Sequence, residues 1–196
     1  MREISPVIVV YKRNLLFASF GLNSGEWKMP DYYVALVKEY LELQDFIVRT
    51  ETKYKIRKKD KRGIERTSWG DIDILAMKAK DNNVFEAIIG EVKAEYKTEK
   101  EIEEINEDKF ENLYVKQKLE ELLGTTNYKK YLFCWSWHPM RREFAEKLGI
   151  TPVSFDEIIT YMLKKVEEHK GWFYLMDYPN LMLLQFLQTR GYLRKE

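Results

Sequence analysis

Residues 131–137 read Tyr-Leu-Phe-Cys-Trp-Ser-Trp and are almost entirely apolar or aromatic. A short run of this kind, bounded by polar residues, is typical of a strand that is buried on both faces. Such strands occur in sheets with parallel pairing, because helices cover both faces of those sheets. The segment therefore predicts an α/β fold in which this strand lies inside the sheet.

The rest of the chain predicts an alternating series of helices and strands. We expect elements over residues 30–45 (helix), 46–57, 68–79 and 84–94 (strands), 95–123 (one long helix), 131–137 (strand), 139–148 (helix), 150–155 (strand), 156–168 (helix) and 171–196 (helix). Short turns between the early strands favour antiparallel pairing, whereas intervening helices favour parallel pairing later. The predicted architecture is a three-layer α/β core, with a mixed central sheet flanked by helices in the order αβββαβ.

One domain accounts for the whole length. The chain has 196 residues, of which 45% are hydrophobic, so it can bury a substantial core. We find no internal repeat or low-complexity tract that would divide it. The prediction is a single domain over residues 1–196, with its core at about 30–137 and a helical extension at about 171–196.

Charge and cysteine content exclude several classes of protein. The 33 Lys and Arg residues nearly balance 32 Asp and Glu, which excludes a polybasic mode of binding and leaves only local patches for polyanions. The single cysteine, Cys134, excludes an internal disulfide and a thiolate zinc site, and it predicts a cytoplasmic setting. No apolar stretch reaches the ~20 residues of a membrane span, so no membrane partner is expected.

Four ionisable residues lie on the two strands around the turn Asp-Asn-Asn at 81–83. A hairpin centred on Asn82 places Asp73 opposite Glu91, with Cβ atoms ~4.5–5.5 Å apart. The two-residue period of a strand adds Lys93 to the face of Glu91 and Asp71 to the face of Asp73. The pattern predicts one patch that contains three carboxylates and one ammonium group.

Opposed carboxylates repel each other, so a cation between them is the functional interpretation of this patch. Oxygen ligands without nearby histidine or cysteine favour magnesium or manganese over zinc. Lys93 is then placed to orient the attacking water or to stabilise charge on a phosphate. The alternative interpretation is a solvated ladder of cross-strand ion pairs, which contributes little.

The sequence Gly-Asp-Ile-Asp-Ile-Leu-Ala over 70–76, followed by Glu-Val-Lys over 91–93, resembles the PD-(D/E)xK nuclease superfamily. This superfamily has the restriction-endonuclease-like fold and includes the archaeal Holliday junction resolvases. The predicted order of elements over 30–137 matches its core. The resemblance implies that Asp73 and Glu91 hold the metal and that Lys93 assists the attacking water.

The chain departs from the resolvase-like pattern in its first helix. Those relatives carry a glutamate there, and the corresponding residue in this chain is Val34. Asp31 and Glu39 lie before and after this position, and either is a candidate substitute. For Asp31 the alternative role is a negative charge at the helix N-terminus. In the following helix, Gln117 falls where many relatives place a polar residue near the active site.

A basic segment precedes the Asp73 strand. Residues 53–66 contain eight basic side chains against Asp60 and Glu65, an excess that suits contact with phosphates. The alternative is a charged hairpin tip that keeps an edge strand from pairing with other chains. The candidate nucleic-acid contacts are Lys55, Arg57, Lys58, Lys59, Lys61, Arg62 and Arg66. Residues 95–111 are acidic and are expected to repel DNA.

The prediction that unites these features is a magnesium-dependent (or manganese-dependent) endonuclease that hydrolyses phosphodiester bonds in DNA. The alternative is a weak or inactive protein of the same fold that binds nucleic acid or a protein partner, because Val34 replaces the expected glutamate. A third alternative is a structural α/β domain in which Asp73 and Glu91 do not converge. The apolar stretch 181–187 is the candidate interface of a homodimer.

Overall fold

The computed structural model describes residues 32–59, 65–79, 85–95, 97–168 and 178–193. The side chains of residues 57–59, 65 and 66 are outside the described set as well. Several sequence-predicted site residues therefore lie outside the described residues: Asp31, Lys61 and Arg62 entirely, and Arg57, Lys58, Lys59 and Arg66 in their side chains.

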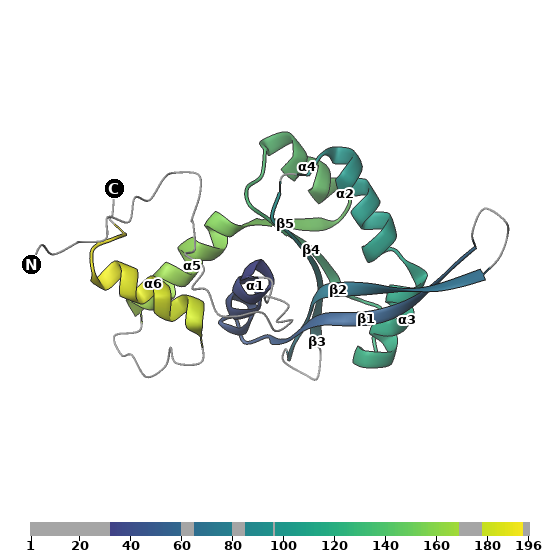
Figure 1. Ribbon diagram of the computed structural model, residues 1–196, viewed down its shortest axis with the longest axis horizontal. Helices are drawn as coiled ribbons and strands as arrows, with labels where there is room; N and C mark the ends of the chain where they lie inside the picture. Colours follow the sequence, from purple (N-terminus) through teal and green to yellow (C-terminus); the bar gives the residue numbers. More distant parts are fainter. Residues whose placement is uncertain (1–31, 60–64, 80–84, 96, 169–177, 194–196) are drawn as a thin grey trace, which may run out of the picture.

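A five-stranded mixed sheet forms the centre of the molecule (Figure 1). Its strands, in spatial as well as chain order, are β1 (Ile47–Lys59), β2 (Glu65–Ala79), β3 (Phe85–Lys93), β4 (Lys129–Cys134) and β5 (Ile150–Ser154). The first three strands pair antiparallel, while β4 and β5 add in parallel. The mixed sheet predicted from the sequence is confirmed.

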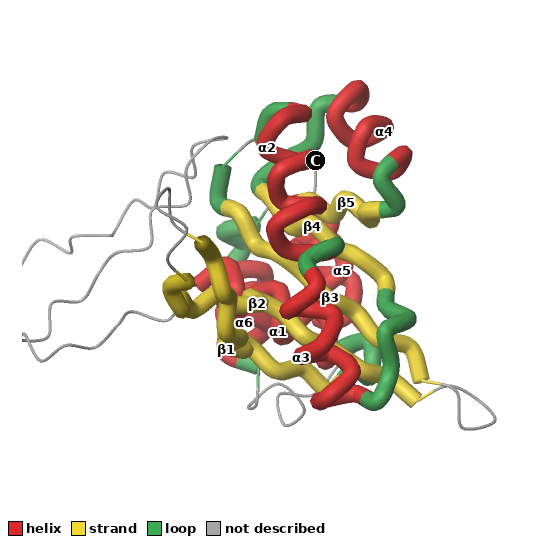
Figure 2. Tube along the Cα trace, turned by 90° about the vertical axis from the view of Figure 1, so that its right-hand side faces the viewer, coloured by secondary structure: helices red, strands yellow, loops and turns green. Residues whose placement is uncertain are grey.

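Helices cover both faces of this sheet, and Figure 2 shows α3 in front of the strands with α1 and α6 behind them. One face carries α1 (Tyr32–Glu42), α5 (Phe155–Glu168) and α6 (Pro179–Thr189). The other carries α2 (Glu99–Ile105), a π-helix η2 (Asn106–Phe110), α3 (Leu113–Leu123) and α4 (Pro139–Lys147). Each layer buries its own apolar core against the sheet, so the three-layer α/β architecture is confirmed.

Glu39 joins α1 to α6. Its side chain is buried, and its carboxylate accepts hydrogen bonds from the backbone N–H groups of Asn180 and Leu181 and from the Asn180 amide. A carboxylate at a helix N-terminus satisfies unpaired backbone donors and interacts favourably with the helix dipole. Leu181 then enters the same core as α1 and α5, so this contact anchors the C-terminal helix.

The single long helix predicted over 95–123 is wrong. Thr98 begins α2 with a capping box, and after η2 the backbone turns extended at Asn112, with φ −63° and ψ 128°. The Asn112 side chain accepts the N–H of Tyr114 and so starts α3 as a separate helix. Local side-chain capping therefore overrides the continuous helical pattern.

The new start of α3 also changes which residues point inward. Val115 and Leu119 are buried, whereas Leu113 is 64% exposed and Gln117 is exposed. Gln117, which the resemblance placed near the active site, therefore does not point into the core. Among the described residues, no helix has both the length and the apolar character needed to cross a membrane.

Candidate active site

Asp73 and Glu91 lie where strands β2 and β3 separate. The ladder between the strands runs from Ala79 opposite Phe85 to Ile74 opposite Gly90, and Asp73 and Glu91 are the next positions. This is the register predicted from a hairpin centred on Asn82. Beyond it, β2 continues on β1 as a two-stranded arm, while β3 continues on β4 (Figure 1). The two carboxylates therefore occupy a fork in the sheet.

The side of the sheet to which successive β2 side chains point changes at this fork. Ile72 and Leu75 pack into the core under α3, but Ile74 and Ala76 pack into the core under α1, so the alternation shifts at Asp73. Glu51, which falls opposite Asp73 between two ladder pairs, has a φ of 50°. The regular alternation of β2 is thus broken between Ile72 and Ile74, next to the left-handed Glu51. Asp71 still belongs to the patch of Glu91, because Lys109 Nζ lies 3.4 Å from Asp71 Oδ1 and 3.6 Å from Glu91 Oε1.

Glu91 is almost completely buried, with 2% of the residue exposed, and two lysines surround its carboxylate. The Nζ atom of Lys93 lies 2.6 Å from Oε1, and the Nζ atom of Lys109 lies 3.6 Å from the same oxygen. Strand β3 directs both Glu91 and Lys93 to the side of the sheet that η2 covers. The buried negative charge is thereby compensated, as an ionised group away from water requires.

Lys109 is a site residue that the sequence analysis missed. It belongs to η2, and its Nζ donates a hydrogen bond of 2.7 Å to the backbone carbonyl of Asp71. The same Nζ lies 3.4 Å from Asp71 Oδ1, so Lys109 links Asp71 to Glu91. The sequence feature that could have identified it is the position of this lysine just before the buried Phe110 in an otherwise acidic segment. Lys109 lies in the π-helix η2, and π-helical segments often occur at functional sites.

Asp71 is the outer carboxylate of the cluster. Lys53 donates to its Oδ2 over 3.0 Å, and Lys109 approaches its other oxygen. These lysines hold the pKa of Asp71 below its usual range, with the hydrogen bond from Lys53 as the largest cause. Asp71 therefore stays ionised at neutral pH and connects the cluster to the arm.

Asp73 has the opposite electrostatic character. Burial, followed by repulsion from Glu91, raises the pKa of Asp73 from 3.8 to about 6. The N–H of Val92, which donates to Asp73 Oδ2 over 2.9 Å, opposes this rise, as do the charges of Lys93 and Lys109. An additional cation between Asp73 and Glu91 would remove the repulsion that raises this pKa.

Tyr54 covers the cluster from β1. It is 3% exposed, and its ring lies against Gly70, where an added Cβ would come within 2.5 Å of Tyr54 Cζ. Burial, followed by the charges of Glu91, Asp71 and Asp108, raises the pKa of Tyr54 to about 12. The phenol therefore remains protonated and places a hydrogen-bond donor beside the carboxylates.

The donor set fits a hydrated hard cation. Within the described part of the chain, no group of three or more His, Cys, Asp or Glu side chains is arranged to hold a metal ion. Magnesium needs no such cage, since one or two carboxylates commonly bind it together with waters and substrate phosphates. Asp73 and Glu91 supply two carboxylates at the fork, which meets this smaller requirement.

Other residues singled out in the sequence lie elsewhere. The Glu39 carboxylate binds the N-terminus of α6. Val34 is buried in the core between α1 and the sheet. Gln117 and Lys55 line a groove between α3 and the arm, beside the carboxylate cluster. Of the predicted site residues, the fold thus brings Asp71, Asp73, Glu91 and Lys93 together and leaves Gln117 at the margin.

A scan against protein-family models, a search of curated proteins and a search of solved structures each found no match to this chain. The function is therefore argued from the geometry of the site.

Proposed function

We propose that the protein is a metal-dependent nuclease that hydrolyses phosphodiester bonds in DNA. The observation that carries the proposal is the convergence of Asp73 and Glu91 at the sheet fork, with the Lys93 ammonium 2.6 Å from Glu91. A buried and a half-buried carboxylate that repel each other are costly in a fold, and groups perturbed in this way cluster at functional sites. The resemblance of the motif to the PD-(D/E)xK superfamily supports the same proposal.

In this proposal Asp73 and Glu91 hold magnesium or manganese, which when bound supplies Lewis-acid stabilisation to the phosphate. The Lys93 ammonium orients the attacking water and offsets negative charge on the phosphate as the new P–O bond forms. The attacking water gives up a proton to solvent as its oxygen bonds to phosphorus. The opposite P–O bond breaks, and the leaving oxygen takes up a proton from solvent. Lys109 adds a second positive charge on the same side of Glu91.

A catalytically weak binding protein is the second candidate. The observation that favours it is Val34, a buried aliphatic residue in the place of the expected glutamate. Glu39 does not replace that acid, since its carboxylate is already used by α6. This candidate retains the basic arm and predicts binding of DNA without cleavage.

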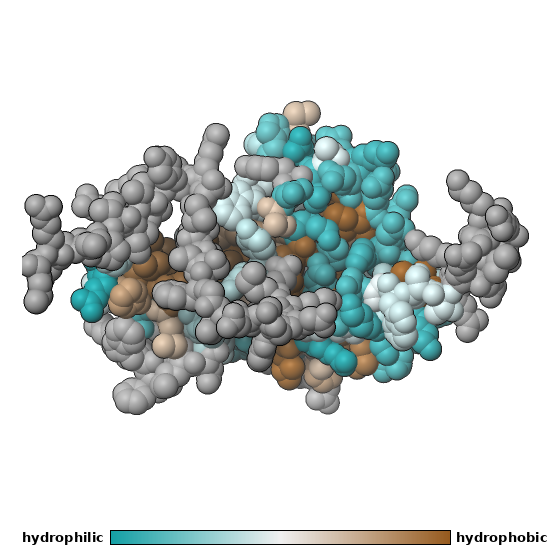
Figure 3. Space-filling model, viewed as in Figure 1, coloured by the Kyte–Doolittle hydropathy of each residue, from teal (hydrophilic) through white to brown (hydrophobic). Residues whose placement is uncertain are grey.

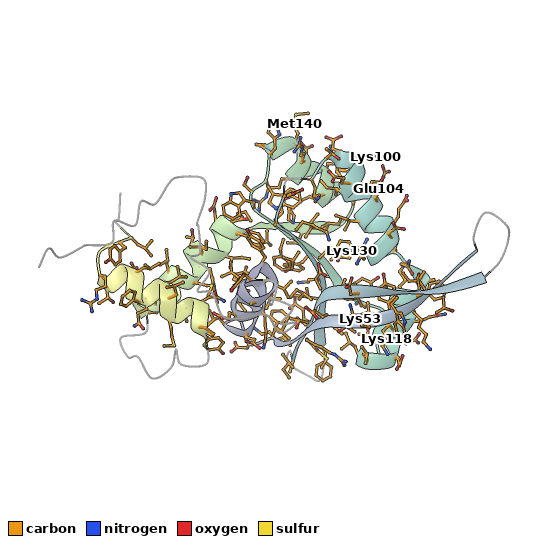
Figure 4. The ribbon with its side chains drawn as sticks, in the orientation of Figure 1. Lys53, Lys100, Glu104, Lys118, Lys130 and Met140 are labelled. Atoms are coloured by element: carbon orange, nitrogen blue, oxygen red, sulfur yellow. The ribbon has the colours of Figure 1, made fainter. Side chains whose placement is uncertain are left out.

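Cleavage of a panel of single-stranded, duplex, flapped and four-way DNA tests the two candidates. The intact protein is compared with Lys93→Ala and with the matched control Lys100→Ala, whose side chain is 84% exposed on α2 (Figure 4). Circular dichroism must first establish that all three proteins are folded. Metal-dependent cutting by the protein and the control, lost in Lys93→Ala, supports the nuclease. Binding without cutting by any of them supports the second candidate.

We further propose a homodimer that uses α6. Leu183 is 37% exposed and Phe186 is 43% exposed, and apolar atoms gather over α6 at the left of Figure 3. Removal of the whole tail is a poor test because Leu181 of this helix is part of the core. Light scattering of the Leu183→Glu/Phe186→Glu variant is the sharper test, and an unchanged mass would contradict the proposal.

The cytoplasmic setting expected from Cys134 stays a prediction.

A further inference from the structure

A groove of about 640 Å³ lies between the β1–β2 arm and α3. The arm contributes Lys53, Lys55 and Trp69, and α3 contributes Tyr114 and Lys118. Figure 4 shows Lys53 and Lys118 close to each other where the arm passes α3. The volume is within the range of ~300–1,000 Å³ that is typical of ligand sites.

Trp69 is the unusual residue of this groove. It is 63% exposed, although tryptophan is normally among the more buried side chains. The Lys55 ammonium lies 5.4 Å from the centre of its ring, where it forms a cation–π contact. An exposed indole with a lysine beside it presents a stacking surface next to a positive charge, the combination by which proteins bind unpaired bases and their phosphates.

The charge of the groove favours an anion. Its lining includes Lys53, Lys55 and Lys118 against one carboxylate, Glu121, which pairs with Lys118 at 3.0 Å. Lys55 forms no ion pair within the part of the chain that the structure describes, so its charge is available to a phosphate. The excess positive charge of the groove therefore lies on the arm, while Lys118 on the α3 wall is paired with Glu121.

Lys53 connects the groove to the carboxylate cluster. Its Nζ contacts Asp71, and Asp71 is joined through Lys109 to Glu91. Tyr54 belongs to both regions, since it lines the groove and the charge of Glu91 contributes to its raised pKa. A strand bound in the groove would therefore lie next to the proposed site of cleavage.

We propose that this groove binds single-stranded DNA, with one unpaired base stacked on Trp69 and the adjoining phosphates on Lys53, Lys55 and Lys118. Stacking on an indole requires an exposed base face, which a paired duplex does not offer except at its ends. The inference rests on the proposed nuclease function and specifies its substrate as DNA with an unpaired segment.

Fluorescence anisotropy with labelled DNA in the presence of EDTA tests the groove without requiring cleavage. We expect the protein to bind single-stranded DNA more tightly than duplex of the same length. Trp69→Ala should weaken single-strand binding by about 5- to 150-fold, the loss of one stacked base, and Trp69→Phe should restore part of it. Lys100→Ala is the matched control and should bind like the intact protein.

The lysines are tested by the salt dependence of the same binding. Replacing Lys53, Lys55 or Lys118 by Ala should each reduce the slope of log affinity against log salt by about 0.7, the value for one single-strand phosphate. Trp69→Ala should leave that slope unchanged. Unchanged single-strand affinity in folded Trp69→Ala, or tighter binding of duplex than of single strands, would overturn the groove proposal.

The cleavage assay separates this result from the nuclease proposal. Single-strand binding that depends on Trp69, in a protein that cuts no DNA with magnesium or manganese, would support the groove proposal and contradict the nuclease proposal. Metal-dependent cutting together with single-strand binding that is unchanged in Trp69→Ala would contradict the groove proposal and still support the nuclease proposal.

Discussion

The backbone N–H of Val92 donates a hydrogen bond of 2.9 Å to the carboxylate of Asp73. This bond closes the β2–β3 ladder with a side chain at the point where the strands separate. It fixes Asp73 beside Glu91 without a cation, because the amide dipole partly offsets the burial of the acid. The site is thus built into the sheet itself and does not depend on a loop.

Asp73→Asn should stabilise the protein at neutral pH. The pKa of Asp73 is about 6 in the folded chain against 3.8 for the free side chain, so folding favours the protonated acid. Its stabilising contribution is present below about pH 4 and is lost as the pH rises through 6. Relative to Asp73→Asn, the protein should lose about 2 kcal/mol between pH 4 and pH 7, as urea denaturation would measure.

Comparison of the two proteins removes the titration of shared groups that do not interact with Asp73, such as the buried Glu39. A difference in stability that is the same at pH 4 and pH 7 would contradict the raised pKa. Added magnesium should stabilise only the protein with Asp73, because the variant lacks one of the two proposed ligands.

Lys109→Met should lower the free energy of unfolding by about 1–3 kcal/mol, because it removes a cation from the buried Glu91 and a donor from the Asp71 carbonyl. Methionine preserves most of the aliphatic volume, so the loss reports the charge. Lys100→Met is the control, with an expected change below about 0.5 kcal/mol for an exposed pair. Equal effects of the two substitutions on the urea midpoint would show that Lys109 is not part of the buried cluster.

Gly90→Ala should destabilise the fold by about 1–3 kcal/mol through overpacking. A Cβ at this position would lie 2.8 Å from the Phe133 ring and 3.1 Å from Ile74 Cβ. Phe133→Leu removes the clashing ring atom, so the double variant should be more stable than the sum of the two single effects predicts. A double-mutant cycle with no coupling would rule out this contact as the reason for glycine.

Glu39→Ala should release α6, because it leaves the N–H groups of Asn180 and Leu181 without their acceptor. We expect a loss of about 2–4 kcal/mol and faster proteolysis within α6. Manganese affinity, measured by calorimetry at a temperature where the variant is folded, should stay within threefold of the original. A large loss of manganese affinity in folded Glu39→Ala would instead place this acid in the metal site.

Sequence reasoning was most successful where spacing alone determines geometry. The spacing of the two strands around Asn82 predicted the Asp73–Glu91 register, and the apolar run around Phe133 predicted a parallel inner strand. It failed where one local interaction changes the backbone path. The Asn112 cap divides a predicted helix, the alternation of β2 is broken next to the left-handed Glu51, and Lys109 lies in the π-helix η2. None of these three leaves a periodic signal in the sequence.

The fork also determines the order in which the strands can pair during synthesis of the chain. Strands β1 and β2 are neighbours in sequence and can pair as soon as both have been made, so the arm forms from local contacts. Glu91 and Lys93 lie beyond the β2–β3 ladder and gain a pairing strand only when β4 is complete, after the whole helical segment from Glu99 to Leu123 has emerged. A nascent chain that ends before Lys129 carries every acid of the site, but its β3 still lacks the strand that pairs with it beyond Gly90.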